Sequence, residues 1–187
     1  MPERPATERE RYPLGEGTAN FYAQMVGAHA QREQRYRDVP DVTPADAMPW
    51  EDTPYGRLKH LANRGMSNSS IGSLDVFILE IPPGGHSGKH RHFAEEFMFV
   101  VEGRGYSTHW TPDPGLTDAG YTWPVPSDEA ATRWDWEQGD ALTVLPMTVH
   151  QHFNTDPDRP ARILCAMARA YESVGFEGIE DLESASR

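Results

Sequence analysis

The chain has 187 residues, a formal net charge of −12 and a hydrophobic content of 37%. Its five Trp, seven Tyr and seven Phe residues supply enough large apolar groups for the core of one domain, which excludes a wholly disordered chain. The acidic balance excludes nucleic acid and an anionic membrane surface as main partners, because both attract clustered Lys and Arg.

The single cysteine, Cys165, has no partner for an internal disulfide, which fits a reducing compartment. No stretch approaches the ~18 apolar residues of a membrane span. The N-terminal residues lack the apolar segment of a secretion signal. We therefore expect a cytoplasmic protein.

Residues 1–47 are polar and interrupted by prolines, with one helical stretch at 18–38. Phe21 with Met25, and Tyr22 with Val26, are spaced by four residues and would form a narrow apolar stripe. The pattern predicts an N-terminal arm with one helix that lies on the core or on a second subunit. The alternative is a partly disordered leader.

Residues 48–172 have the pattern of a β domain. Short runs rich in Val, Ile, Phe, Tyr and Thr alternate with Gly, Pro and Asp turns. They predict strands at 73–82, 96–103, 105–110, 132–140, 141–146, 149–154 and 161–170. The second and third runs form a hairpin at Gly103. Many short strands without intervening helices predict an all-β fold, either a sandwich or a barrel.

Two further segments flank or interrupt this pattern. Residues 111–130 contain four prolines and little strand character, and a loop of this length in a compact domain is typical of a lid or a mobile insertion. Residues 173–187 are expected to form an acidic C-terminal tail.

The stretch "GGHSGKHRHFAEE" (84–96) concentrates histidine and glutamate. His90 and His92 are two apart on a strand, so their side chains share a face, with Cα atoms roughly 6.6 Å apart. Both imidazoles can therefore reach one ion. Glu96 keeps the same parity and adds a carboxylate oxygen. Two His and one carboxylate with open positions form the ligand set of non-heme Fe(II) oxygenases.

A further ligand is expected from "GDALTVLPMTVHQHFN" (139–154). In its last strand His150, His152 and Asn154 share one face. If that face lines the same cavity, His150 supplies the third imidazole, with His152 and Asn154 behind or beside it.

These two stretches carry a family resemblance. Gly84-x5-His90-x-His92-x3-Glu96-x6-Gly103 resembles the first cupin motif at every fixed position. Gly139-x6-Pro146-x3-His150-x3-Asn154 resembles the second, although its Gly-to-Pro spacing is one residue longer than usual and Thr148 stands where a glycine is common.

The resemblance covers about residues 70–170 and implies a double-stranded β-helix, the small jelly-roll barrel of cupins. It also implies that one divalent metal is held inside the barrel by His90, His92, Glu96 and His150. Fe(II) is the first expectation, and Mn, Ni or Zn would also suit these ligands.

The barrel interior is expected to include a substrate pocket. Met98 and Val100 share the parity of Glu96, and Trp134 and Trp136 share a strand face that could form an aromatic wall. Tyr106 and Thr108 alternate with Ser107 and His109, and only one of these sets can face inward. Plain core packing explains these residues equally well. The expected pocket consists of Met98, Val100, Tyr106, Thr108, Trp134, Trp136, His152 and Asn154.

Three functions are compatible with the resemblance, since cupins serve many. The stretches "EEFMFVVEGRGYSTHW" and "HQHFN" are similar to single-cupin relatives of gentisate-type ring-cleaving dioxygenases, which implies an Fe(II) enzyme that uses O₂ to cleave a small aromatic or dicarbonyl-type compound. The second is an O₂-independent lyase, isomerase or decarboxylase. The third is a non-catalytic small-molecule-binding cupin.

Cupin barrels commonly dimerise through edge strands, so we expect a homodimer or higher homo-oligomer. The apolar stripe of the N-terminal helix and the region of Trp50 are the candidate surfaces.

Overall fold

The computed structural model describes residues 22–23, 26–27, 30, 34, 37–39, 41–63, 71–118, 120–175 and 178–186. Contacts within the chain separate it into two units, Met1–Val39 and Pro40–Arg187. The short 3₁₀ helix η1 (Ala45–Ala47) therefore groups with the second unit, although the sequence places the end of the arm at residue 47. No helix in the described ranges is long and apolar enough to cross a membrane.

The described residues of the first unit between 22 and 38 are helical. The side chains of Tyr22 and Val26 are exposed. Phe21 and Met25, the other members of the expected apolar stripe, lie outside the described residues.

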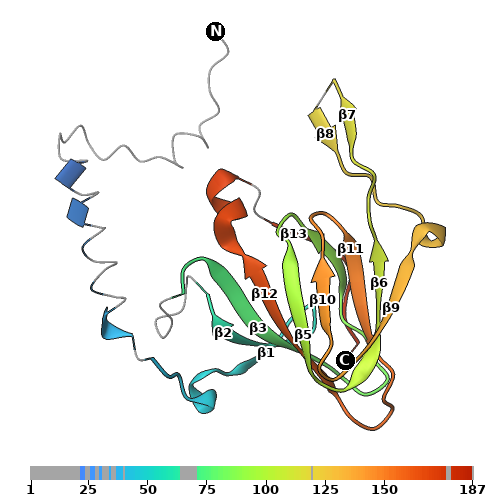
Figure 1. Ribbon diagram of the computed structural model, residues 1–187, viewed down its shortest axis with the longest axis horizontal. Coiled ribbons are helices and arrows are strands. Elements are labelled where there is room, and N and C mark those ends of the chain that lie inside the picture. Colours follow the sequence, from blue (N-terminus) through green and yellow to red (C-terminus); the bar gives the residue numbers. More distant parts are fainter. Residues whose placement is uncertain are drawn as a thin grey trace. The chain divides into compact units, whose positions relative to one another are not determined.

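Two antiparallel sheets build the second unit (Figure 1). The six-stranded sheet has the order β1 (Trp50–Asp52), β2 (Arg57–Ala62), β3 (Leu74–Ile81), β12 (Ala161–Ala168), β5 (Glu96–Glu102), β10 (Ala141–Val144). The five-stranded sheet has the order β13 (Ile179–Glu183), β4 (Lys89–His92), β11 (Val149–Asn154), β6 (Arg104–Trp110), β9 (Thr132–Glu137). The strand order, in which neighbours in space are distant in sequence, is that of a jelly roll, and it confirms the expected all-β barrel.

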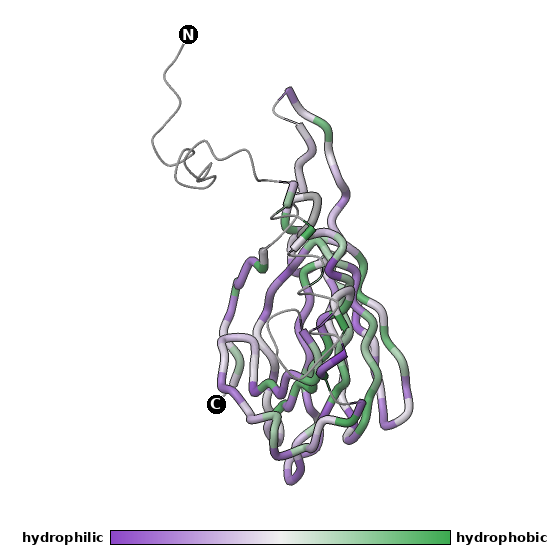
Figure 2. Tube along the Cα trace, turned by 90° about the vertical axis from the view of Figure 1, so that its left-hand side faces the viewer, coloured by the Kyte–Doolittle hydropathy of each residue, from purple (hydrophilic) through white to green (hydrophobic). Residues whose placement is uncertain are grey.

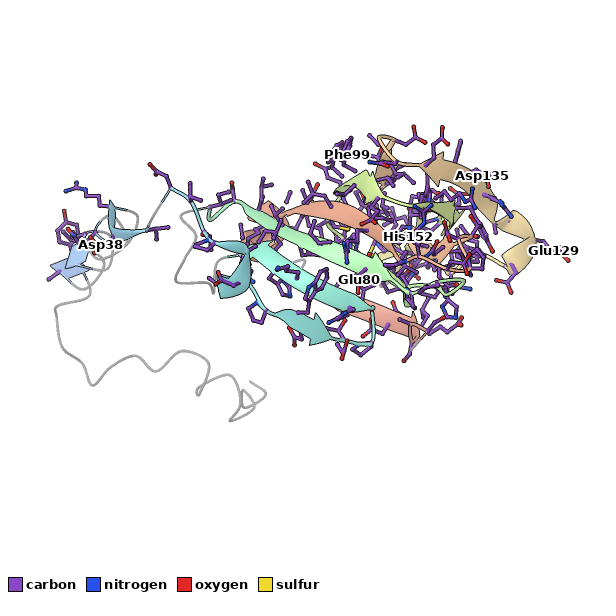
Figure 3. The ribbon with its side chains drawn as sticks, turned by 90° about the horizontal axis from the view of Figure 1, so that it is seen from below. Asp38, Glu80, Phe99, Glu129, Asp135 and His152 are labelled. Carbon is purple, nitrogen blue, oxygen red and sulfur yellow. The ribbon has the colours of Figure 1, made fainter. Side chains whose placement is uncertain are left out.

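Alternation along the strands directs one face of each sheet into the core. In β5, Glu96, Met98 and Val100 are buried, whereas Phe99 is exposed. Figure 3 shows Phe99 on the outside of the barrel and His152 between the sheets. Apolar residues follow the strands of the barrel in Figure 2. The buried cluster comprises Leu58, Phe77, Leu79, Ile81, Met98, Val100, Trp136, Val144, Ala161, Ile163 and Cys165.

The C-terminal residues expected to form a tail contribute a strand instead. β13 pairs with β4 in antiparallel register, with Asp181 opposite His90 and Ile179 opposite His92. Glu180 also accepts a hydrogen bond from Arg91 at 2.6 Å. The strand that carries two of the expected metal ligands is therefore covered along one edge by the end of the described chain.

The expected long loop contains a short hairpin of β7 (Gly115–Thr117) and β8 (Gly120–Thr122), which projects from the barrel, and the 3₁₀ helix η2 (Asp128–Ala130) (Figure 1). Its base is fastened to β4, because Arg91 donates a hydrogen bond to the Trp123 carbonyl and Lys89 to Asp128. Its role as a lid remains a prediction.

Two turns show which backbone conformations the residues of the cupin motifs adopt. Gly103 has φ 97°, and a Cβ at this position would lie 2.8 Å from Ala161, so the β5–β6 hairpin requires glycine there. In the second motif, the left-handed residue is Met147, with φ 60°, and not Thr148. The Thr148 amide closes this turn on the Leu145 carbonyl at 3.1 Å. Met147, a non-glycine residue two positions before β11, therefore has unfavourable backbone geometry.

Candidate metal centre

Three buried histidines meet on the inner face of the five-stranded sheet. His90 and His92 lie on β4, and His150 lies directly opposite His90 on β11. The ring centroid of His150 is 4.1 Å from that of His90 and 5.1 Å from that of His92. Residues directly opposite on neighbouring strands share a face, so the pairing of β4 with β11 is what brings the two motifs together.

The donor atoms of the three histidines all lie within 4.8 Å of one another. Glu96 reaches them from β5 in the opposite sheet, with its Oε2 atom 3.4 Å from His92 Nε2 and 3.5 Å from His150 Nε2. All four residues predicted as ligands are therefore brought to one place between the sheets, three from one sheet and one from the other.

Backbone carbonyls fix the orientation of each imidazole. The Nδ1 atoms of His90, His92 and His150 lie 3.3, 2.7 and 2.9 Å from the carbonyl oxygens of Gly88, Ala94 and Thr148. A carbonyl can only accept, so each Nδ1 carries a proton, and Nε2 is the atom of each ring that can bind a metal. Such outer hydrogen bonds orient histidine ligands of metals in proteins.

The donors that point into the centre lack hydrogen bonds to any described residue. These atoms are Nε2 of His92, Nε2 of His150 and both carboxylate oxygens of Glu96. Burial alone would raise the pKa of Glu96, but the neighbouring His150 and His92 rings hold it well below its usual range. Burial and the nearby His150 lower the pKa of His90. The facing imidazoles can donate a proton to the ionised carboxylate or, as neutral ligands, bind a divalent cation together with it. The residues present fit such an ion.

Tyr55 and Cys165 adjoin the centre and were not predicted as part of it. The Tyr55 ring packs edge-on against His90, with centroids 4.2 Å apart. Burial, together with the nearby Glu96 carboxylate, raises the pKa of the Tyr55 phenol and of the Cys165 thiol well above their ordinary values. A neutral phenol and a neutral thiol therefore border the carboxylate. The sequence signal for Tyr55 is weak, since "DTPYGR" reads only as a turn.

A cavity of ≈ 630 Å³ opens beside His90, His92 and Glu96. It lies among the ends of β2, β3 and β12, the start of η3 (Arg169–Val174), and β4 and β13. Its apolar lining includes Tyr55, Leu58, Phe77, Phe93, Met167 and Ile179. None of the eight residues expected to form the substrate pocket lines this cavity.

The register of β6 corrects the placement of Tyr106 and Thr108. His109 and Ser107 lie opposite His150 and His152 of β11, so they face inward and are buried. Tyr106 and Thr108 consequently face outward. Tyr106 stacks on Phe153 at 4.6 Å, under the guanidinium of Arg133.

The two tryptophans of β9 have different surroundings. Trp136 is buried, packs over Gly105 and donates a hydrogen bond from Nε1 to Ser107 Oγ at 3.0 Å. Trp134 is 55% exposed, because β9 is the edge strand of its sheet. The expected aromatic wall is therefore reduced to Trp136, which serves the core.

The other four residues expected in the pocket instead pack in the core or hydrogen-bond to other parts of the barrel. Met98 and Val100 face inward as expected but belong to the core cluster. His152 is fully buried, with Nδ1 2.7 Å from Ser107 Oγ. Asn154 donates hydrogen bonds to the carbonyls of Ile81, Pro82 and Arg159, and so joins two loops at the end of the barrel.

The fold and the buried cluster define a cupin-fold protein with a three-histidine site that could hold a metal. No family model matches the chain, and no curated protein matches it. Among solved structures, a variant of Bacillus subtilis oxalate decarboxylase is similar with a TM-score of 0.56 and 16% identity over 78% of this chain and 33% of that chain.

Vicilin from hazelnut, Corylus avellana, has a TM-score of 0.53 and 18% identity over 75% of this chain and 36% of that chain. The polyketide cyclase RemF from Streptomyces resistomycificus has a TM-score of 0.51 and 14% identity over 77% and 86%. The chain spans about a third of the length of the decarboxylase and of vicilin. These similarities confirm the cupin resemblance at the level of the fold.

Proposed function

We propose that this protein is a metal-dependent cupin enzyme, and that it is an Fe(II) dioxygenase which oxidatively cleaves a small aromatic or dicarbonyl-type compound. The observation that carries the proposal is the convergence of three buried imidazoles and one buried carboxylate beside an apolar cavity. His90, His92, His150 and Glu96 would hold the ion. This donor set leaves coordination positions for small molecules.

A bound metal would lower the pKa of a coordinated enol or phenol and favour electron donation toward O₂. The chain's own residues supply position and environment. Gly88, Ala94 and Thr148 orient the imidazoles through their carbonyls. Leu58, Phe77 and Met167 line the approach with apolar surface, which excludes water and strengthens electrostatic interactions at the centre.

The test is anaerobic purification, loading with Fe(II), and O₂-uptake measurements against a panel of small aromatic and dicarbonyl compounds. We expect iron-dependent uptake with at least one compound, and loss of uptake in Glu96→Gln. An iron-loaded protein that consumes no O₂ with any of them would contradict the dioxygenase proposal.

A second candidate is an O₂-independent lyase, isomerase or decarboxylase. It is favoured by the similarity to oxalate decarboxylase, a protein with Mn(II) centres. Imidazole and carboxylate ligands suit Mn, Ni and Zn as well as Fe. Turnover of a substrate by the Mn-loaded protein under strict anaerobiosis would support this candidate.

A third candidate is a non-catalytic small-molecule-binding protein, for which ligand-induced stabilisation without conversion would be the sign. We further propose a cytoplasmic homodimer or higher homo-oligomer. Light scattering that shows a lone 21.0 kDa species would contradict the dimer.

A further inference from the structure

The cavity beside the metal centre is large for a two-carbon substrate. Its volume is ≈ 630 Å³, whereas an apolar cavity of ~150 Å³ is enough to hold benzene in another protein. Pockets for drug-sized ligands span roughly 300–1,000 Å³. The cavity therefore has room for a ligand of two or three rings.

The walls of the cavity favour flat apolar groups. Leu58, Phe77 and Met167 come from the inner face of the six-stranded sheet, and Ile179 comes from β13 at the rim. The rings of Tyr55 and Phe77 meet edge-on at 6.1 Å and 83°. Such a lining favours the transfer of aromatic rings out of water and disfavours a charged group.

The formal charges around the cavity match a divalent cation. Arg169 is the one Lys or Arg among its described lining residues, and it donates a hydrogen bond to Asp75. Asp181 and Glu96 add two more carboxylates. Three carboxylates and one guanidinium carry a formal charge that a divalent cation would cancel.

We propose that this cavity binds an aromatic chelator of two or three rings, such as a diol that releases its protons on chelation, in preference to a chelator with one ring. The inference rests on the proposed function, because its chelating end requires a metal at His90, His92, Glu96 and His150. The neighbouring oxygens of the ligand face these residues, and its rings lie among Leu58, Phe77 and Met167.

Matched probes test the proposal without turnover. The protein is loaded with Fe(III) and titrated with catechol and with 2,3-dihydroxynaphthalene, which share one chelating group and differ by one ring. Charge-transfer absorption of the bound diolates reports binding of both diols. We expect the naphthalenediol to bind about tenfold more tightly than catechol, because its second ring is buried. Equal affinities would overturn the proposal.

Two tryptophan substitutions on β13 locate the second ring. Ile179 lines the cavity and is 60% exposed, whereas Leu182, on the same strand and 40% exposed, does not line it. Ile179→Trp is expected to weaken the naphthalenediol about tenfold and catechol less than about twofold, by removing space for one buried ring. Leu182→Trp should leave both unchanged. Equal effects of the two substitutions on the naphthalenediol would contradict the assigned cavity.

Failure of this inference differs from failure of the proposed function. If the protein binds the naphthalenediol more tightly than catechol but consumes no O₂, the dioxygenase proposal is rejected and the proposed ligand class stands. A chain that holds no iron would reject the metal centre. Calorimetry with 2-naphthol and phenol on the metal-free protein would then test ring size, and 2-naphthol must still bind more tightly and be weakened by Ile179→Trp.

Discussion

His90 and His150 lie directly opposite each other on adjacent antiparallel strands, with ring centroids 4.1 Å apart, although they belong to separate sequence motifs. If they share one ion, each is as important for binding as the other. We expect His90→Gln and His150→Gln each to lower metal affinity by more than the ~10–100-fold that loss of a supporting hydrogen bond causes.

Metal stoichiometry after loading with Fe(II) or Zn(II) and gel filtration measures this effect. His60→Gln is the matched control, since His60 borders the same cavity and packs against Phe77 without belonging to the cluster. Full occupancy in both ligand variants would show that the cluster is not a metal site.

Glu96→Gln is expected to lower the stability of both the metal-free and the metal-loaded protein. The His150 and His92 rings hold the pKa of the buried Glu96 carboxyl well below its usual range, so the folded state favours the ionised group, and its neutralisation should cost the apo protein about 1–3 kcal/mol. With metal at about 100 times the Kd, the native protein gains about 2.7 kcal/mol, and the variant gains less. Thermal unfolding of chelator-treated and reloaded samples measures both changes. A higher Tm of the metal-free variant would contradict this account of the centre.

Ser107 joins two buried side chains, because its hydroxyl lies within hydrogen-bond distance of both Trp136 Nε1 and His152 Nδ1. Ser107→Ala leaves both nitrogens without this partner inside the barrel and should cost about 2–4 kcal/mol. Thr108→Ala, on the outer face of the same strand, should cost less than about 0.5 kcal/mol. Denaturant unfolding of the two variants compares them directly, and similar losses would argue against an inward-facing Ser107.

Met147 has φ 60° in the turn before β11, a conformation that costs roughly 1–2 kcal/mol for a residue with a Cβ. Met147→Gly is therefore expected to raise stability by about 1 kcal/mol, or roughly 2–4 °C in Tm. Thr148→Gly, one residue later and without positive φ, should lower stability instead. Thermal unfolding of both variants under identical metal conditions checks the sign. Stabilisation by Thr148→Gly alone would place the left-handed residue at the usual position of the family motif.

Periodicity was sufficient for an all-β fold, whereas the jelly roll and the meeting of the four ligand candidates were expected from the cupin resemblance. β3, β5, β6, β11 and β12 lie within a few residues of the predicted runs, because each strand has one buried face that sets its alternation. The strands β1, β2, β7, β8 and β13 were missed. Every residue of β13 is exposed, so its sequence has no hydrophobic alternation to detect.

The cavity could not be predicted for a different reason. Its walls combine the turn at Tyr55, the end of β12 and the strand β13, and only the pairing of strands distant in sequence places them together. The inward set of β6 likewise depends on its register with β11. That register pairs His109 with His150, and the residue spacing within either strand alone does not predict it.

The ligand candidates are divided between the sheets, three on one and Glu96 alone on the other. A cation bound to all four residues would connect the two sheets, and the metal–ligand bond lengths would set the distance between them. Bulky or small substitutions deep in the barrel would then alter preference among ions of different radius without changing any coordinating atom. Selectivity among metal ions would then depend on side-chain packing throughout the barrel.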